Sequence, residues 1–256
     1  MSRLVVLLLS LVLALPLPVQ ALDLQGLYEQ ALRASRQGDF MEALPLWDRF
    51  LEQAPHDAAA LSNRGNVRLA RGDPAGAIKD QSASIVLAPE ESDPHLNRGT
   101  AEEALQDWSA AADDYLWILE RDPQDASALY NLANVRGSQD DWPEARELYG
   151  QAALARPGFA MARSSEALAA WQAGDLDWAE AELRKLIRRY PLFADARAAL
   201  SGLLWREGSS GEAESHWAAA AGLDQRYRQA DWLQQVRRWP PQPTADLMAF
   251  LALEAS

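Results

Sequence analysis

A proline recurs every 34 residues along most of this chain, and this spacing constrains the fold more than any other feature. The prolines in register are Pro55, Pro89, Pro123, Pro157 and Pro191. An alanine series has the same period: Ala43, Ala77, Ala111, Ala145, Ala179 and Ala213. A third series holds only small residues: Ala31, Gly65, Gly99, Ala133, Ala167 and Ser201. A 34-residue period with small residues and proline at fixed offsets indicates a repeated helical hairpin.

Each unit has the pattern of two helices joined by a tight turn. Counted so that the proline is position 32, the units begin at residues 24, 58, 92, 126, 160 and 194. The turn is clearest in Gly38-Asp39, Gly72-Asp73 and Gly174-Asp175. Glycine adopts positive φ at the end of the first helix at little cost, and the aspartate caps the second helix. The proline then ends the second helix, so we expect an all-α solenoid.

The fourth unit resembles the tetratricopeptide repeat family in the stretch Ala128–Asn134, in Asp141–Ala145 and in Tyr149. The resemblance covers residues 24 to about 227. It implies a right-handed superhelix of six helix-turn-helix units. Position 4, often tryptophan in the family, departs from the pattern in every unit: Leu27, Leu61, His95, Leu129, Arg163 and Arg197. The string Arg237–Pro241 also resembles the tail of some cyanobacterial and plastid repeat proteins.

Beyond the sixth unit, Arg226–Arg238 is predicted to form one capping helix, because a solenoid must cover its last apolar face. The solenoid would then occupy residues 22–238. Residues 239–256 follow as a proline-rich linker and a short helix capped by Thr244. That helix carries several large apolar residues, so we expect it to dock. Whether it covers the capping helix or occupies the groove of the solenoid stays open.

Residues 1–21 are typical of a secretory signal peptide: Arg3 precedes the apolar run Leu4–Leu15, and Val19-Gln20-Ala21 offers a cleavage site. The alternative is an uncleaved anchor, but a run of 12 residues is short of the roughly 30 Å apolar core of a bilayer. We therefore expect export and no membrane span in the mature chain. The compartment is the periplasm or, in a photosynthetic organism, the thylakoid lumen.

The amino-acid composition argues against several kinds of site and partner. The chain has no cysteine, so disulfides, thiolate nucleophiles and zinc–sulfur sites are excluded. Removing the leader leaves 23 basic and 37 acidic residues, which argues against nucleic acid and anionic lipid as partners. No two of the three histidines are paired at helical spacing, and phosphate-loop and nucleophile motifs are absent from the sequence. We expect no metal site, no cofactor and no enzymatic activity.

The resemblance implies that the first helices of the units line a concave groove, with positions 2, 5, 9, 12 and 13 directed into it. Carried over, these positions give the candidate partner-binding residues Tyr28, Ser62, Asn66, Leu69, Thr100, Glu103, Tyr130, Asn134, Leu168, Trp171, Trp205 and Arg206. The alternative for Tyr130 and Asn134 is that they simply follow the repeat pattern. Groove positions 2, 5 and 6 of the first three units hold no lysine or arginine, so a clamp for a partner's carboxylates is not expected.

These observations predict an exported scaffold or assembly factor that binds a segment of a protein partner in its groove. Two alternatives remain. One is a structural module that self-associates through its terminal helices. The other is a non-catalytic helper of an envelope enzyme such as a peptidoglycan hydrolase or synthase.

Overall fold

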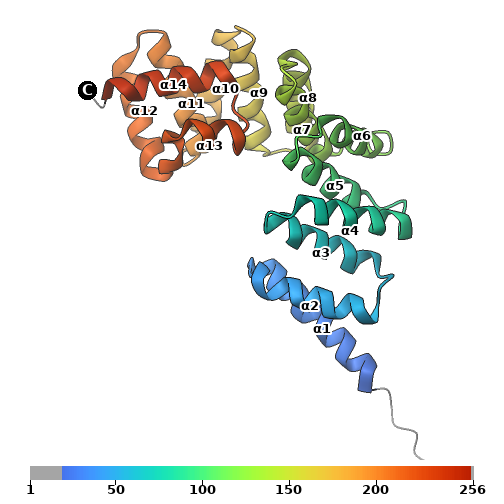
Figure 1. Cartoon of the computed structure of the whole chain (residues 1–256). Coiled ribbons are helices and arrows are strands. Elements are labelled where there is room, and N and C mark those ends of the chain that lie inside the picture. Colours follow the sequence, from blue (N-terminus) through green and yellow to red (C-terminus); the bar gives the residue numbers. More distant parts are fainter. Residues whose placement is uncertain (1–18, 255–256) are drawn as a thin grey trace, which may run out of the picture.

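The computed structural model describes residues 19–254 and is built from helical hairpins (Figure 1). The paired helices are α1 (Val19–Gln37) with α2 (Phe40–Gln53), α3 (Ala58–Ala70) with α4 (Pro74–Leu87), α5 (Ser92–Ala104) with α6 (Trp108–Leu119), α7 (Ala126–Ser138) with α8 (Trp142–Ala155), α9 (Ala160–Gln172) with α10 (Leu176–Arg189), and α11 (Ala194–Arg206) with α12 (Ser210–Leu223). Each predicted unit holds one pair, and the all-α solenoid is confirmed. Within residues 19–254, no helix is both long enough and apolar enough to cross a membrane.

The predicted signal peptide lies almost entirely outside the described residues. Its last three residues, Val19–Ala21, form the start of α1. Cleavage after Ala21 therefore stays a prediction.

The residue series found in the sequence are buried at the helix crossings. All six alanines of the second series are at most 1% exposed. At Gly99 an added Cβ would lie 2.7 Å from the ring of Tyr115, so only glycine allows α6 to approach α5 this closely. Close packing of this kind explains why the small residues keep the 34-residue period.

The turns inside the hairpins have the predicted geometry. Gly72 and Gly174 adopt φ of +80° and +91°. Gln106 and Asp140 adopt the same left-handed conformation without being glycine, with φ of 60° and 62°. The aspartates that follow the first four turns each accept a hydrogen bond from a backbone amide of the next helix: Asp39, Asp73, Asp107 and Asp141. Asp175 differs, because it accepts a hydrogen bond from Arg146 instead.

The C-terminal region differs from the prediction in two respects. Arg226–Arg238 is not one helix: a 3-10 turn (Gln225–Arg228) precedes the short α13 (Ala230–Gln235), because Gln229 is extended between them. The prolines predicted to form a linker partly belong to α14 (Pro241–Glu254). Proline is accommodated in the first turn of a helix, where its missing N–H has no intrahelical partner to lose.

Helix α14 packs on α11, with further contacts to α9 and α13. It crosses the C-terminal hairpins in Figure 1. Because α9 and α11 are first helices of their hairpins, α14 lies in the groove and does not merely extend the end of the solenoid. This settles the alternative that the sequence left open.

Candidate functional site: the concave groove

The groove is the surface formed by the first helices of the hairpins, and it divides into two parts. We call the surface of α1, α3, α5 and α7 the N-terminal groove. The C-terminal groove is the surface of α9 and α11, on which α14 lies. The two parts present different surfaces to a partner.

The N-terminal groove contains two cavities that share a wall on α3. The first, between α3 and α5, has a volume of about 460 Å³. Its lining residues are Ala58, Ala59, Ser62, Asn63, Asn66, Ser84, Ala88, Glu91, Asp93, Pro94 and Asn97. The second, of about 400 Å³, lies between the first hairpin and α3. Asn63 and Asn66 line both cavities.

Asn66 is among the residues predicted from the sequence to bind a partner, whereas Asn63 and Asn97 are not. Asn63, Asn97 and Asn131 are 34 residues apart and occupy position 6 of three successive units, so a signal for them existed. All three are half-buried on the first helices. We call them the asparagine series.

Several predicted groove residues are tied to the second helix of their own hairpin. The Oδ1 atom of Asn66 accepts a hydrogen bond of 2.9 Å from Gln81. In the fourth unit, the hydroxyl of Tyr149 donates to Asn134 Oδ1 over 2.7 Å. Asn134 is only 9% exposed, so its amide holds the hairpin together. This arrangement favours the alternative that Asn134 follows the repeat pattern.

Glu103 is held in the same way, because it accepts a hydrogen bond of 2.6 Å from the hydroxyl of Tyr115. Burial raises the pKa of Glu103, and the bond from Tyr115 and the charge of Arg238 oppose that rise. The carboxyl group is thus engaged from both sides, by α6 and by the C-terminal segment.

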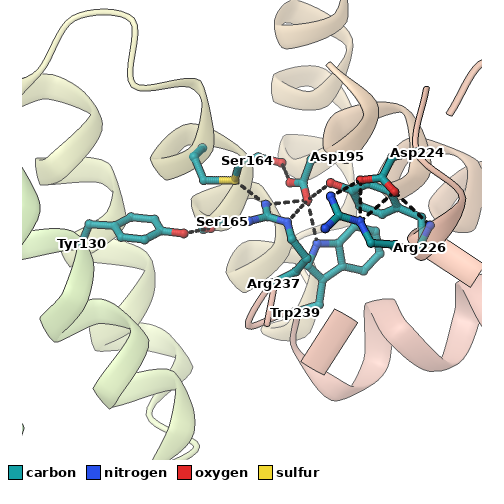
Figure 2. Close-up of polar contacts among 10 residues, drawn as sticks. Tyr130, Ser164, Ser165, Asp195, Asp224, Arg226, Arg237 and Trp239 are labelled. Atoms are coloured by element: carbon teal, nitrogen blue, oxygen red, sulfur yellow. Dashed lines mark hydrogen bonds and ion pairs between the residues drawn. The ribbon is translucent and has the colours of Figure 1, made fainter. Parts of the chain in front are cut away.

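The remaining predicted residues of the N-terminal groove vary in accessibility. Tyr28 is half-buried and packs edge-on against Trp47. Leu69 is also half-buried, and Thr100 is exposed. The ring of Tyr130 packs against Phe159, the last residue of the same unit. Its hydroxyl lies 3.5 Å from Ser165 of the next unit, and Figure 2 shows the two side chains.

The predicted residues of the last two units lie at the C-terminal groove. Leu168 and Trp171 are 2% and 1% exposed and belong to the core that includes α14. Trp205 is half-buried against the same core. Arg206 forms an ion pair of 2.8 Å with Asp246 of α14. The structure therefore brings these residues into contact with the chain's own C-terminus.

A buried carboxylate anchors the segment that leads to α14. Asp195 on α11 is 1% exposed. Its hydrogen-bond donors are Ser164 at 2.6 Å, Tyr227 at 2.9 Å, Arg237 at 3.1 and 2.6 Å, and Trp239 at 3.1 Å. Figure 2 labels Ser164, Arg237 and Trp239 around the carboxylate. Arg237 also contacts the sulfur of Met161. We call this cluster the Asp195 hub, and nothing in the repeat pattern predicted it.

The neighbouring arginine points the other way along the groove. Arg238 has a φ of 57° and places its guanidinium 3.3 Å from Glu103 on α5. It also lies over the ring of Trp108, 5.6 Å from the centroid. The C-terminal segment thereby links the third unit to the sixth.

Comparison with known proteins agrees with this architecture. The Tetratricopeptide repeat family model matches residues 28–92, 96–160, 132–177 and 164–231. DnaJ homolog subfamily C member 3 from Gallus gallus is 37% identical over 71 residues, which cover 28% of this chain. The chain spans only 14% of the length of that relative.

Two solved structures illustrate the shared fold. A tetratricopeptide repeat protein from Parabacteroides merdae has a TM-score of 0.65 at 16% identity, covering 90% of this chain and 99% of its own. YrrB, described as a TPR protein with an unusual peptide-binding site, has a TM-score of 0.54 at 16% identity, covering 70% and 92%. Identities this low show the fold alone, whereas the family model matches most of the chain. The chain belongs to the tetratricopeptide repeat family.

Proposed function

We propose that this chain is an exported scaffold or assembly factor that binds an extended segment of a partner protein in its N-terminal groove. The observation that carries the proposal is that Asn63 and Asn97 of the asparagine series line the cavity of about 460 Å³ between α3 and α5. A side-chain amide both donates and accepts hydrogen bonds, so it can pair with a peptide backbone of any sequence. The similarity to YrrB, whose structure is described as having a peptide-binding site, supports this mode of binding.

The lining of the cavity indicates the chemistry of the segment. Small side chains such as Ala58, Ala59 and Ala88 leave room for a partner's side chains. The charged residues of the lining are Glu91 and Asp93, which are both exposed. These features favour a neutral or basic segment and disfavour an acidic one.

The test is a full-length double variant, Asn63→Ala with Asn97→Ala. The partner would first be captured by crosslinking in the native compartment. We expect the double variant to bind that partner more weakly by at least about 1 kcal/mol while its helical content is retained. Asn134 is unsuitable for this test, because its substitution also removes the buried bond to Tyr149.

The matched control is Gln151→Ala, which removes an exposed amide on the second helix α8. It should leave the affinity unchanged. A folded double variant that binds as tightly as the wild type would place the binding surface outside the N-terminal groove.

Export has its own test. Sequencing the N-terminus of the protein isolated from its native host should give Leu22 as the first residue. Recovery of Met1 or Ser2 on exported protein would contradict cleavage and favour an anchor.

A further inference from the structure

We infer that the C-terminal groove is a receptor for a helix, that α14 occupies it, and that a partner helix with the same contact pattern replaces α14. The inference concerns α9 and α11 and does not depend on peptide binding by the N-terminal groove. It rests on three features: the surface under α14, the pattern of residues on α14, and the place where the C-terminal segment is anchored.

The surface under α14 is shaped to receive a helix. Gly202 on α11 faces α14, and a Cβ added there would lie 3.2 Å from the backbone of Leu247. The two helix backbones are therefore in direct contact at this point. Leu247 and Phe250 of α14 are 0% and 3% exposed. They belong to the same core as Trp171.

Polar contacts at the edge of this interface fix the direction of the helix. Asp246 pairs with Arg206 over 2.8 Å. One turn earlier in α14, the backbone amide of Gln242 donates to Gln172 Oε1 on α9 over 2.8 Å. This amide belongs to the first turn of α14, where backbone N–H groups lack intrahelical acceptors. A helix that binds this groove as α14 does should therefore carry an acidic residue followed directly by an apolar one, as in Asp246-Leu247. A second apolar residue, equivalent to Phe250, follows one turn beyond.

The Asp195 hub holds the chain just before α14 and not α14 itself. Arg237 and Trp239 are the members of the hub nearest to the helix. Pro240 alone separates Trp239 from Pro241, the first residue of α14. The helix can therefore leave its groove as a unit while the hub keeps the preceding segment in place. Such local opening of a terminal element requires much less free energy than global unfolding.

The experiment uses the full-length chain with Leu247→Ala and Phe250→Ala, together with a fluorescent peptide of residues 241–256. In the wild type, the attached α14 competes with the peptide. The apparent affinity for the peptide is therefore the affinity of the empty groove multiplied by the fraction of molecules in which α14 has left it. The substitutions weaken the attached helix and leave α9 and α11 unchanged. We expect the variant to bind the peptide at least about 10-fold more tightly than the wild type does.

Two controls accompany this measurement. A peptide with the same two substitutions should bind neither protein, because it lacks the apolar anchors. A full-length variant with Ala245→Ser and Ala249→Ser changes two exposed positions of α14 and should behave as the wild type. The Asn63→Ala, Asn97→Ala variant should also match the wild type, so failure of the two proposals can be told apart.

Circular dichroism and thermal unfolding decide the remaining outcomes. A variant that stays helical and cooperative but does not bind the peptide would overturn the inference. Loss of cooperative unfolding would overturn it as well, because α14 would then be an indispensable part of the core. If the wild type is a dimer that the peptide dissociates, the helix that replaces α14 is the α14 of a second copy. That result would overturn the assignment to a different partner.

Discussion

At the scale of single residues, Asp195 shows how a buried charge can be satisfied. Burial acts to lower the pKa of Arg237, but the charge of Asp195, the electrostatic effect of Tyr227 and the hydrogen bonds to Asp195 together outweigh it, and the pKa is raised. Ser164, Tyr227 and Trp239 satisfy the rest of the carboxylate. Breaking such a cluster leaves an uncompensated charge inside the protein, which costs far more than an exposed ion pair contributes.

Asp195→Ala should therefore lower the free energy of unfolding by about 3–5 kcal/mol, because Arg237 loses its buried partner. Denaturant unfolding measures the change. Glu120→Ala serves as the control, since this exposed residue lies 3.9 Å from Arg121, and it should change stability by no more than about 0.5 kcal/mol. A loss below about 1 kcal/mol for Asp195→Ala would mean that the hub adds little to stability.

Glu102 on α5 is a buried carboxyl group that, unlike Asp195, lacks sufficient compensation for the loss of solvent. Burial raises its pKa from 4.5 to about 7, the nearby Asp114 adds to the rise, and Arg98 opposes it. A carboxyl whose pKa is higher in the folded state binds its proton more tightly there. Its contribution to stability is present at low pH and is lost as the pH rises from about 4.5 to about 7.

Glu102→Gln should therefore make the protein more stable than the wild type at pH 8, because the amide carries no charge to bury. The difference is on the order of 1 kcal/mol for each unit of the pKa shift, and it should disappear near pH 4. Urea unfolding at the two pH values measures it. A variant less stable than the wild type at pH 8 would show that the ion pair with Arg98 outweighs the cost of burial.

At the scale of the helical hairpin, the turns carry a local conformational cost in two units. Gln106 and Asp140 adopt the positive φ that glycine provides at Gly38, Gly72, Gly174 and Gly208. A residue with a Cβ is disfavoured in this region by roughly 1–2 kcal/mol. Replacing it with glycine removes this cost, but the larger conformational entropy of glycine in the unfolded state offsets part of the gain.

Gln106→Gly should accordingly raise the free energy of unfolding by roughly 0.5–1 kcal/mol, because the side chain of Gln106 is exposed and its loss removes little packing. The matched control is the reverse change in the second unit, Gly72→Gln, which should destabilise the protein. Thermal unfolding of the two variants gives the comparison. Destabilisation by Gln106→Gly would show that its left-handed conformation carries no net cost.

At the scale of the whole molecule, the core is divided along the solenoid. One apolar cluster lies in the first two hairpins, a second in the middle hairpins, and the largest in α9–α14. Between the first and second clusters, α4 buries the polar residues Asp80, Gln81 and Ser84. Arg64 pairs with Asp80 there, so the charge is compensated, but little apolar area is buried. Repeats mainly contact their neighbours, so the stability of each region reflects its own core.

Native-state hydrogen exchange should therefore show α1–α4 opening with a lower free energy than α9–α12. Helix α14 adds contacts to α9 and α11. Among the described residues, no additional helix packs on the first helices of the first two hairpins in this way. The measurement is the exchange free energy of amides in each helix. Equal values along the chain would show that the solenoid unfolds as a single cooperative unit.

The sequence by itself determined the repeated part of this protein. The 34-residue period predicted six hairpins, the glycine–aspartate turns, the buried alanines and the proline that follows the second helix in the first five units. These features depend on contacts within a hairpin or between neighbouring hairpins, and the same contact recurs in each unit. A contact that recurs in each unit requires the same type of residue at the same position of each unit. Such contacts therefore produce a period that is visible in a single sequence.

Only the tertiary structure decided the path of the C-terminal segment and hence which part of the groove is open. Arg237 meets Asp195 across 42 residues, and Arg238 meets Glu103 across 135 residues. Each contact occurs once, so no periodicity marks it in the sequence. Helix α14 looked like a short appendage after a linker, because the apolar pattern of a helix does not specify which surface it covers. The surface of α9 and α11 accepts it because Gly202 and the buried Trp171 leave a site of matching shape, a property of the assembled fold.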